Sequence, residues 1–158
     1  MSRVVVRWLA VAFALFHVYN NWFTAVSELW FAAIHFAGFG GLCALTFHKP
    51  DSAISRHPLR EGFDVLLALL SVSVAVYLVL FEDALYVRQA EFVTADFFFS
   101  ALAVLLAMEF ARRTSGWFMP VLILLSLSYI LFLGRYVPGV FAFPGLSLET
   151  VLYRSYWS

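Results

Sequence analysis

Apolar residues gather in five long runs along the chain, and short polar stretches separate the runs. The runs are Val4 to Phe23, Trp30 to Phe47, Phe63 to Phe81, Thr94 to Ala111 and Trp117 to Gly134. A helix over the last run would be about 27 Å long at 1.5 Å per residue, which is close to the hydrocarbon thickness of a bilayer. The pattern therefore predicts an all-α integral membrane protein with about five transmembrane helices.

The composition agrees with this fold class. Hydrophobic residues make up 63% of the chain and charged residues 13%, and the mean hydropathy is +0.89. This balance lies far from that of a soluble domain. Membrane lipid is therefore the expected surrounding. The formal net charge is zero, so nothing indicates a nucleic-acid partner. The single cysteine, Cys43, excludes an internal disulfide and a cysteine-based metal cluster.

The first run has a second interpretation as a cleaved signal peptide. Basic residues precede its apolar part, and Ala25 and Ser27 offer a small-x-small cleavage site. The bulky residues 19–23 make a poor approach to such a site, so we expect a retained helix.

Basic residues predict the orientation of the chain. With a cytoplasmic N-terminus, seven basic residues lie inside and three outside. The inner set is Arg3, Arg7, Lys49, Arg56, Arg60, Arg112 and Arg113, and the outer set is Arg88, Arg135 and Arg154. Because cytoplasmic loops carry the excess of Lys and Arg, this distribution favours an N-terminus in the cytoplasm.

Several polar residues stand where helix ends are expected. Ser27 and Glu28 can cap and charge the second helix, and Asp64 falls in the first turn of the third. Thr94 is the expected N-cap of the fourth helix, with Asp96 opposing the positive end of the helix dipole.

Small residues recur at every fourth position of the second run, at Ala33, Ala37 and Gly41. Such a face allows a neighbouring helix to approach closely, so these residues are predicted to pack helices. On this hypothesis, Gly41→Leu weakens packing or assembly.

The C-terminal segment, residues 137–158, contains two Pro-Gly breakers and then the amphipathic stretch LSLETVLYRSYW. We expect this stretch to form a short helix that lies along the membrane interface.

Glu109 is a candidate functional residue because it lies in or near hydrocarbon, where a carboxylate can relay protons or cations. Arg112 and Arg113 follow at i+3 and i+4, on the same helix face. We therefore favour a structural ion pair that anchors the inner interface together with Trp8 and Trp117.

His17 and His35 are the candidate cofactor ligands. They lie at similar predicted depth on the first two helices, so facing imidazoles would be able to hold a b-type haem. Core histidines without a ligand are far commoner, and no cofactor is expected. The chain shows no phosphate loop and no nucleophile motif, and we predict that it is not an enzyme.

One segment resembles a known family. The run LLAMEFARRTSGWFMPVLILLSLSYILFLGRYVPG, residues 105–139, is similar to the part of fused TRAP transporter permeases of the TAXI-receptor type that precedes the large permease domain. The shared features are Glu109, Arg112, Arg113, Gly116, Trp117, Pro120, Tyr129, Gly134, Pro138 and Gly139. The run FDVLLALLSVSVAVYLVLFEDAL resembles the preceding helix and loop, and the first fifty residues resemble the family more loosely.

The resemblance implies a small Q-type scaffold subunit in a bacterial inner membrane. Its partner would be a large M-type permease subunit that moves as an elevator. A periplasmic TAXI-type receptor would deliver an organic acid, and a cation gradient, usually sodium, would drive uptake. Residues 1–114 would then form a four-helix scaffold and residues 115–136 a connecting transmembrane helix. Residues 137–158 would be an interfacial tail leading to the large permease domain, whose sequence this chain lacks.

Overall fold

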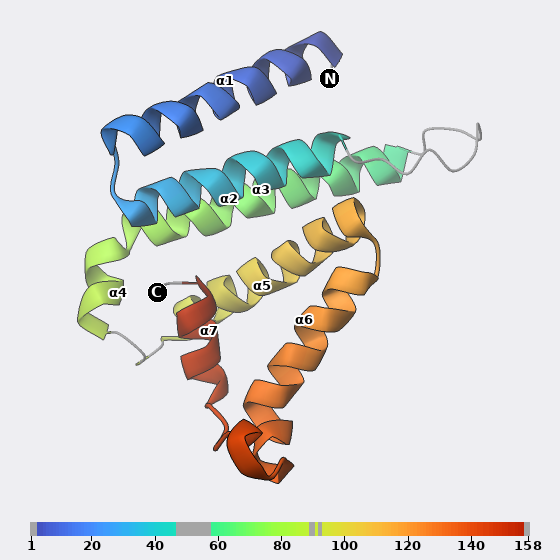
Figure 1. The fold of residues 1–158 in the computed structure, drawn as a ribbon. Helices are drawn as coiled ribbons and strands as arrows, with labels where there is room; N and C mark the ends of the chain where they lie inside the picture. The colour runs from blue at the N-terminus through green and yellow to red at the C-terminus, as the bar shows by residue number, and fades with distance from the viewer. Residues whose placement is uncertain (1–2, 47–57, 89–90, 92, 157–158) are drawn as a thin grey trace. The chain divides into compact units, whose positions relative to one another are not determined.

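The computed structural model describes residues 3–46, 58–88, 91 and 93–156, and regular structure within them is helical throughout (Figure 1). The α-helices are α1 (Arg3–Phe23), α2 (Glu28–Thr46), α3 (Pro58–Leu80), α4 (Glu82–Arg88), α5 (Thr94–Ser115), α6 (Phe118–Ser128) and α7 (Leu148–Tyr156). Five segments are long and apolar enough to cross a membrane, namely Val4–Phe23, Glu28–Thr46, Glu61–Leu80, Thr94–Ser115 and Phe118–Tyr136. The predicted all-α membrane fold with five spans is thereby confirmed.

The chain divides into two compact units, residues 1–80 and 81–158. In the first unit, α2 and α3 lie side by side and form its main helix contact (Figure 1). Buried residues of α3 recur at spacings of three and four, as one stripe of a helix requires: Leu67, Ser71, Val74 and Leu78. The helix α1 buries little, and most of its apolar side chains are exposed, as expected of a helix that faces lipid or a partner.

The turn between α1 and α2 is held by side-chain caps. The side-chain oxygen of Asn20, a buried residue, accepts a hydrogen bond from the Val26 backbone N–H at 3.0 Å. Thr24 takes a left-handed backbone conformation with φ of 48°, which ends α1. The Ser27 hydroxyl accepts from the Trp30 N–H at 3.4 Å, and Glu28 stands in the first turn of α2, as predicted.

Close approach between α1 and α2 occurs at Gly38. A Cβ at this position would overlap the Phe13 ring, so the ring occupies the space that a larger residue would fill. On the predicted packing face, Ala33 is buried while Ala37 and Gly41 are half-buried. A Cβ at Gly41 would meet nothing within 4 Å, so packing at Gly41 against another chain stays a prediction.

Two predicted helix starts are wrong. The helix α3 begins at Pro58, so Asp64 lies beyond the first turn, whose acidic residue is Glu61. The N-cap of α5 is Val93, because the side chain of Asp96 accepts a hydrogen bond from the Val93 N–H at 3.1 Å and ties down the residue before Thr94. Asp96 does stand in the first turn of α5, where a negative charge opposes the helix dipole.

The fifth span changes its helical winding near its end, which the sequence did not predict. After α6 come a π-helix, η1 (Tyr129–Leu133), and a 3-10 helix, η2 (Gly134–Tyr136). The Gly134 N–H bonds to the carbonyl of Tyr129, five residues earlier, so the carbonyl of Ile130 lacks its usual partner at i+4. The Leu146 N–H supplies that partner at 3.1 Å.

Residues 137–147, called the hook from here on, fold back against the end of the fifth span and form hydrogen bonds with η1 and η2. The contacts of the hook with the span include the Phe143 N–H to the Gly134 carbonyl at 3.0 Å and the Tyr129 hydroxyl to the Phe141 carbonyl. Gly145 adopts φ of 87° close to the carbonyl of Leu131, a conformation that favours glycine. A further short 3-10 helix, η3 (Gly139–Phe141), lies within the hook.

The helix α7 follows the hook and packs on α5 (Figure 1). Ser147 caps α7 by accepting from the Thr150 N–H at 3.2 Å, and Val151 and Leu152 are buried. The predicted short helix is therefore present, and its apolar side is covered by protein. Its placement along a membrane interface stays a prediction.

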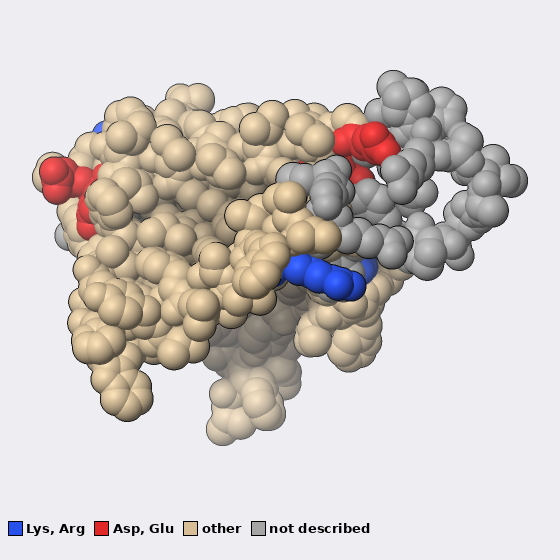
Figure 2. Space-filling view, turned by 90° about the horizontal axis from the view of Figure 1, so that it is seen from above, with Lys and Arg blue, Asp and Glu red and all other residues tan. Residues whose placement is uncertain are grey.

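Figure 2 shows the charged side chains in a few small groups on a surface that is otherwise uncharged. The first turns of α2, α3, α4 and α5 hold five acids: Glu28, Glu61, Glu82, Asp83 and Asp96. A surface of this kind suits a hydrocarbon layer between two aqueous boundaries.

The hook predicts a specific effect of Gly134→Ala. A Cβ there would lie 2.7 Å from Cβ of Phe143 and 3.1 Å from its carbonyl oxygen, so the hook must shift. We expect a loss of about 1–3 kcal/mol of stability, seen as a lower thermal unfolding midpoint in detergent micelles. The matched control is Gly62→Ala in α3, where a Cβ meets nothing within 4 Å. Equal midpoints for the two variants would contradict the assignment.

Candidate functional site

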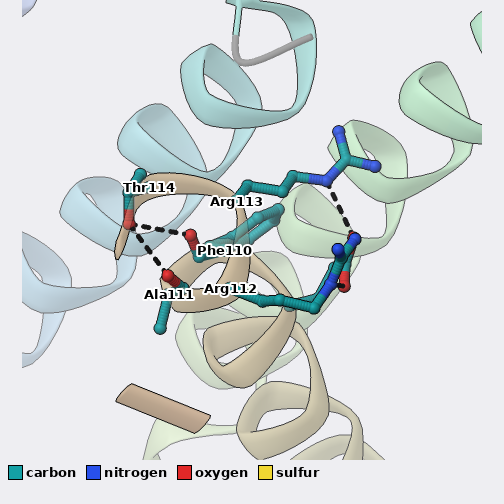
Figure 3. A network of polar contacts seen from close by, with 6 residues as sticks. Phe110, Ala111, Arg112, Arg113 and Thr114 are labelled. Atoms are coloured by element: carbon teal, nitrogen blue, oxygen red, sulfur yellow. Dashed lines mark hydrogen bonds and ion pairs between the residues drawn. The ribbon is translucent and has the colours of Figure 1, made fainter. Parts of the chain in front are cut away.

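The C-terminal end of α5 carries a three-residue charged cluster of Glu109, Arg112 and Arg113. Arg112 binds the carboxylate through two hydrogen bonds, Nε to Oε2 at 2.7 Å and Nη2 to Oε1 at 2.8 Å. Arg113 Nε donates to Oε1 at 2.9 Å. Figure 3 shows both arginine side chains directed at the same point, with Thr114 turned to the carbonyls of Phe110 and Ala111. The i+3 and i+4 pairing predicted from the sequence is present.

The cluster ends the helix as well as pairing its charges. Arg112 and Arg113 lie in the last turn of α5, where positive charge opposes the negative end of the helix dipole. Gly116 follows with φ of 74° and its N–H bonds to the Arg112 carbonyl at 3.0 Å. The Arg112 guanidinium also lies over the Trp117 ring, 5.5 Å from its centroid.

The bonding of Glu109 favours a structural role over a relay. Both of its carboxylate oxygens accept hydrogen bonds from arginine, and its side chain is 22% exposed. A relay needs an oxygen that is available to the transported proton or cation, whereas here two guanidinium groups compensate the single carboxylate. The cluster carries a net charge of +1 and is suited to a fixed position at a membrane boundary.

A second ion pair, at the other end of α5, was missed in the sequence. Arg88, the last residue of α4, donates from Nη2 to Oδ1 of Asp96 at 2.8 Å. The Asp96 side chain is 1% exposed and its other oxygen accepts from Val93, so this buried carboxylate is compensated. The sequence analysis predicts no helix between the third and fourth runs, and the only available signal was the eight-residue spacing of Arg88 and Asp96.

In the first unit, His17 of α1 and His35 of α2 contact each other directly. His17 Nε2 lies 2.8 Å from His35 Nδ1, and His17 Nδ1 donates to the Phe13 carbonyl at 2.8 Å. Four phenylalanine rings surround the pair: Phe13, Phe16, Phe31 and Phe39. The sequence predicted similar depth for the two histidines, and the structure brings them together.

The geometry of this histidine pair does not fit a bis-histidine haem. An iron between two imidazoles needs about 2 Å to each nitrogen and hence about 4 Å between them. The observed separation is 2.8 Å, and one hydrogen bond fills it. Among the described residues, no group of three or more His, Cys, Asp or Glu side chains is placed to hold a metal ion. His48 and His57 lie outside the described residues.

The other predicted anchors are exposed. Trp8 on α1 is 69% exposed and Trp117 is 67% exposed, so both rings are available to an interface or a partner. Their anchoring role stays a prediction.

Comparison with known proteins gives no relative for this chain: no family model, curated protein or solved structure matches it.

The charged cluster predicts the effect of Glu109→Gln. The substitution keeps the shape but removes the charge between two adjacent arginines, so we expect a loss of about 1–2 kcal/mol. Thermal unfolding in detergent measures it. The control is Glu149→Gln, at an exposed acid in the first turn of α7. A Glu109→Gln midpoint no lower than that of the control would show that the cluster contributes nothing to stability.

The histidine geometry predicts a colourless protein. We expect the purified chain to show no Soret band after expression with haem supplied, because the imidazole nitrogens bond to each other. A Soret band that disappears in His17→Ala would instead establish haem binding.

Proposed function

We propose that the chain is a non-catalytic scaffold subunit of a TRAP-type secondary transporter with a TAXI-type receptor. In this proposal it resides in a bacterial inner membrane with its N-terminus in the cytoplasm. A large M-type permease subunit would carry the substrate and ion sites. The imported compound would be an organic acid, and a cation gradient, with sodium as the expected ion, would drive its uptake.

The observation that carries the proposal is the role of the residues in the resembling run. Glu109, Arg112 and Arg113 end α5 as one cluster. Gly134 and Tyr129 close the hook against the fifth span. The described contacts of these residues are with other parts of the same chain, either between charged side chains or between the hook and the span. A segment with this character supports a static part of a transporter better than a moving one.

The charge pattern of α5 explains how such a scaffold would hold its depth. Asp96 pairs with Arg88 at one end, and Arg112 pairs with Glu109 at the other. Sixteen residues separate Asp96 from Arg112 in the sequence, which is about 24 Å along a helix. Displacing α5 along the membrane normal would move one charged end into hydrocarbon, which costs several kcal/mol.

Exposed apolar surface supports the presence of a partner subunit. Only 6% of the most apolar stretch of the first span, Val4–Phe23, is buried within the protein. For the fifth span, Phe118–Tyr136, the buried share is 11%. These helices leave broad faces for lipid and for a second membrane protein. A scaffold subunit requires both kinds of contact.

Copurification tests the proposal. An affinity-tagged chain is purified in mild detergent from membranes of its native host, and we expect a stoichiometric, much larger membrane protein to accompany it. Deleting the gene should abolish sodium-dependent uptake of the organic acid that the complex imports. A stable, monodisperse monomer recovered from membranes that contain the large subunit would refute the proposal, as would uptake that persists without the gene.

A matched pair of variants ties the complex to the cluster. Arg112→Ala leaves Glu109 with a single arginine partner, and we expect it to reduce the yield of complex. The control is Arg135→Ala, because Arg135 is exposed and donates from Nε to the backbone carbonyl of Phe132. Equal losses in both variants would count against an anchoring role for the cluster.

A further inference from the structure

The hydrogen bonds of the histidine pair fix which nitrogen carries each proton. A carbonyl oxygen only accepts, so the proton of His17 is on Nδ1, which donates to Phe13. In a neutral His17 the other nitrogen, Nε2, is then an acceptor. The 2.8 Å contact with His35 therefore requires that His35 Nδ1 is the donor. The remaining nitrogen of a neutral His35, Nε2, carries a lone pair and no proton.

The neutral state is the one that the surroundings favour. The ring contacts of the pair are with phenylalanines, and no acidic or basic side chain bonds to either histidine among the described residues. The neighbouring charges on the two helices are distant in sequence, Arg7 on α1 and Glu28 on α2. A charged imidazolium within an apolar span would lack a counter-ion, which is costly.

Because Nδ1 of His35 bonds to His17, the lone pair on Nε2 points from another side of the ring, and His35 is an exposed residue of α2. One face of this helix consists of Ala32, His35 and Phe39, which are exposed and recur at spacings of three and four. His35 is seven residues from Glu28, about 10 Å along the helix, and therefore lies inside a hydrocarbon layer of about 30 Å. An acceptor without a donor at that depth is unfavourable, and the small Ala32 leaves room for a helix beside it.

We infer that His35 Nε2 is a docking point for a neutral hydrogen-bond donor on a transmembrane helix of a partner protein. The donor is a side-chain hydroxyl, indole N–H or amide N–H. A second copy of this chain does not satisfy the site through the same atom, because its own His35 presents a second acceptor. The identification of the partner as the large permease subunit rests on the proposed function, but the chemistry of the docking point does not.

Two substitutions separate docking from the bond within the pair. In His35→Asn the side-chain amide nitrogen takes the place of Nδ1, so the bond to His17 is kept and the outward acceptor is lost. In His35→Gln the longer side chain places an amide oxygen near the position of Nε2, so an outward acceptor is kept. If docking depends on Nε2, the Asn variant binds the partner more weakly and the Gln variant does not.

The test is photo-crosslinking in native membranes, with benzoylphenylalanine in place of Phe39. We expect a link to a transmembrane helix of another protein, next to a residue that carries a donor. The yield should fall roughly threefold to tenfold in His35→Asn and stay near the original value in His35→Gln. The control site is Leu15 on α1, which is 64% exposed, where His35→Asn should leave the crosslinks unchanged.

Several results would overturn the inference. The first kind is a crosslink to the wrong target: to lipid alone, to a second copy, to residues 81–158 of the same chain, or to a helix without a donor. The second kind is an equal crosslink yield, whether unchanged or reduced, in the His35→Asn and His35→Gln variants. A lower yield in His35→Asn than in His35→Gln, found with a partner that is not a transporter permease, would support the docking point and refute the proposed function. A permease partner whose crosslink yield is the same in both variants would support the proposed function and refute the docking point.

Discussion

Every backbone N–H and C=O inside hydrocarbon needs a hydrogen-bond partner, and this constraint organises the described structure. It makes each span a helix, and it accounts for the hook. Where η1 widens to a π-turn, the carbonyl of Ile130 loses its helical partner and Leu146 replaces it from the hook. Hydroxyl side chains obey the same constraint: Ser71, Ser100, Ser126 and Ser128 bond to carbonyls three or four residues earlier.

Charged side chains near hydrocarbon also need partners, and leaving one unpaired costs more than leaving a backbone group unpaired. The helix α5 shows how the chain pairs them. Its two ends carry the described ion pairs, Arg88 with Asp96 and Arg112 and Arg113 with Glu109. Each carboxylate also accepts a further hydrogen bond: Asp96 accepts from the backbone N–H of Val93, and Glu109 accepts from a second guanidinium group. The interior of the helix is left to apolar residues and Ser100, so α5 is compatible with only a narrow range of depths.

The sequence predicted the features that depend on one helix alone. It did not predict the features that depend on contacts with another element. Five spans followed from run length, and the Glu109 cluster followed from i+3 and i+4 spacing, because both are properties of one helix. The π-turn at Tyr129–Leu133 and the helix α4 did not follow. The first depends on the hook that supplies Leu146, and the second ends at Arg88, whose partner Asp96 lies in the next helix. The N-cap was misplaced from Val93 to Thr94 for the same reason, since the Asp96 carboxylate overrides the usual preference for a hydroxyl.

The two units differ in how they satisfy their polar side chains. In residues 81–158 the carboxylates of Asp96 and Glu109 are paired within the unit. In residues 1–80 the histidine pair satisfies one nitrogen of His35, and the residues Ala32, His35 and Phe39 are exposed. Sequence reasoning selected the same two residues and kept haem only as an alternative, because equal depth alone does not distinguish two ligands of one metal from two rings that bond to each other. The 2.8 Å separation decides between these alternatives, because it holds one hydrogen bond and is too short for an iron between the two nitrogens.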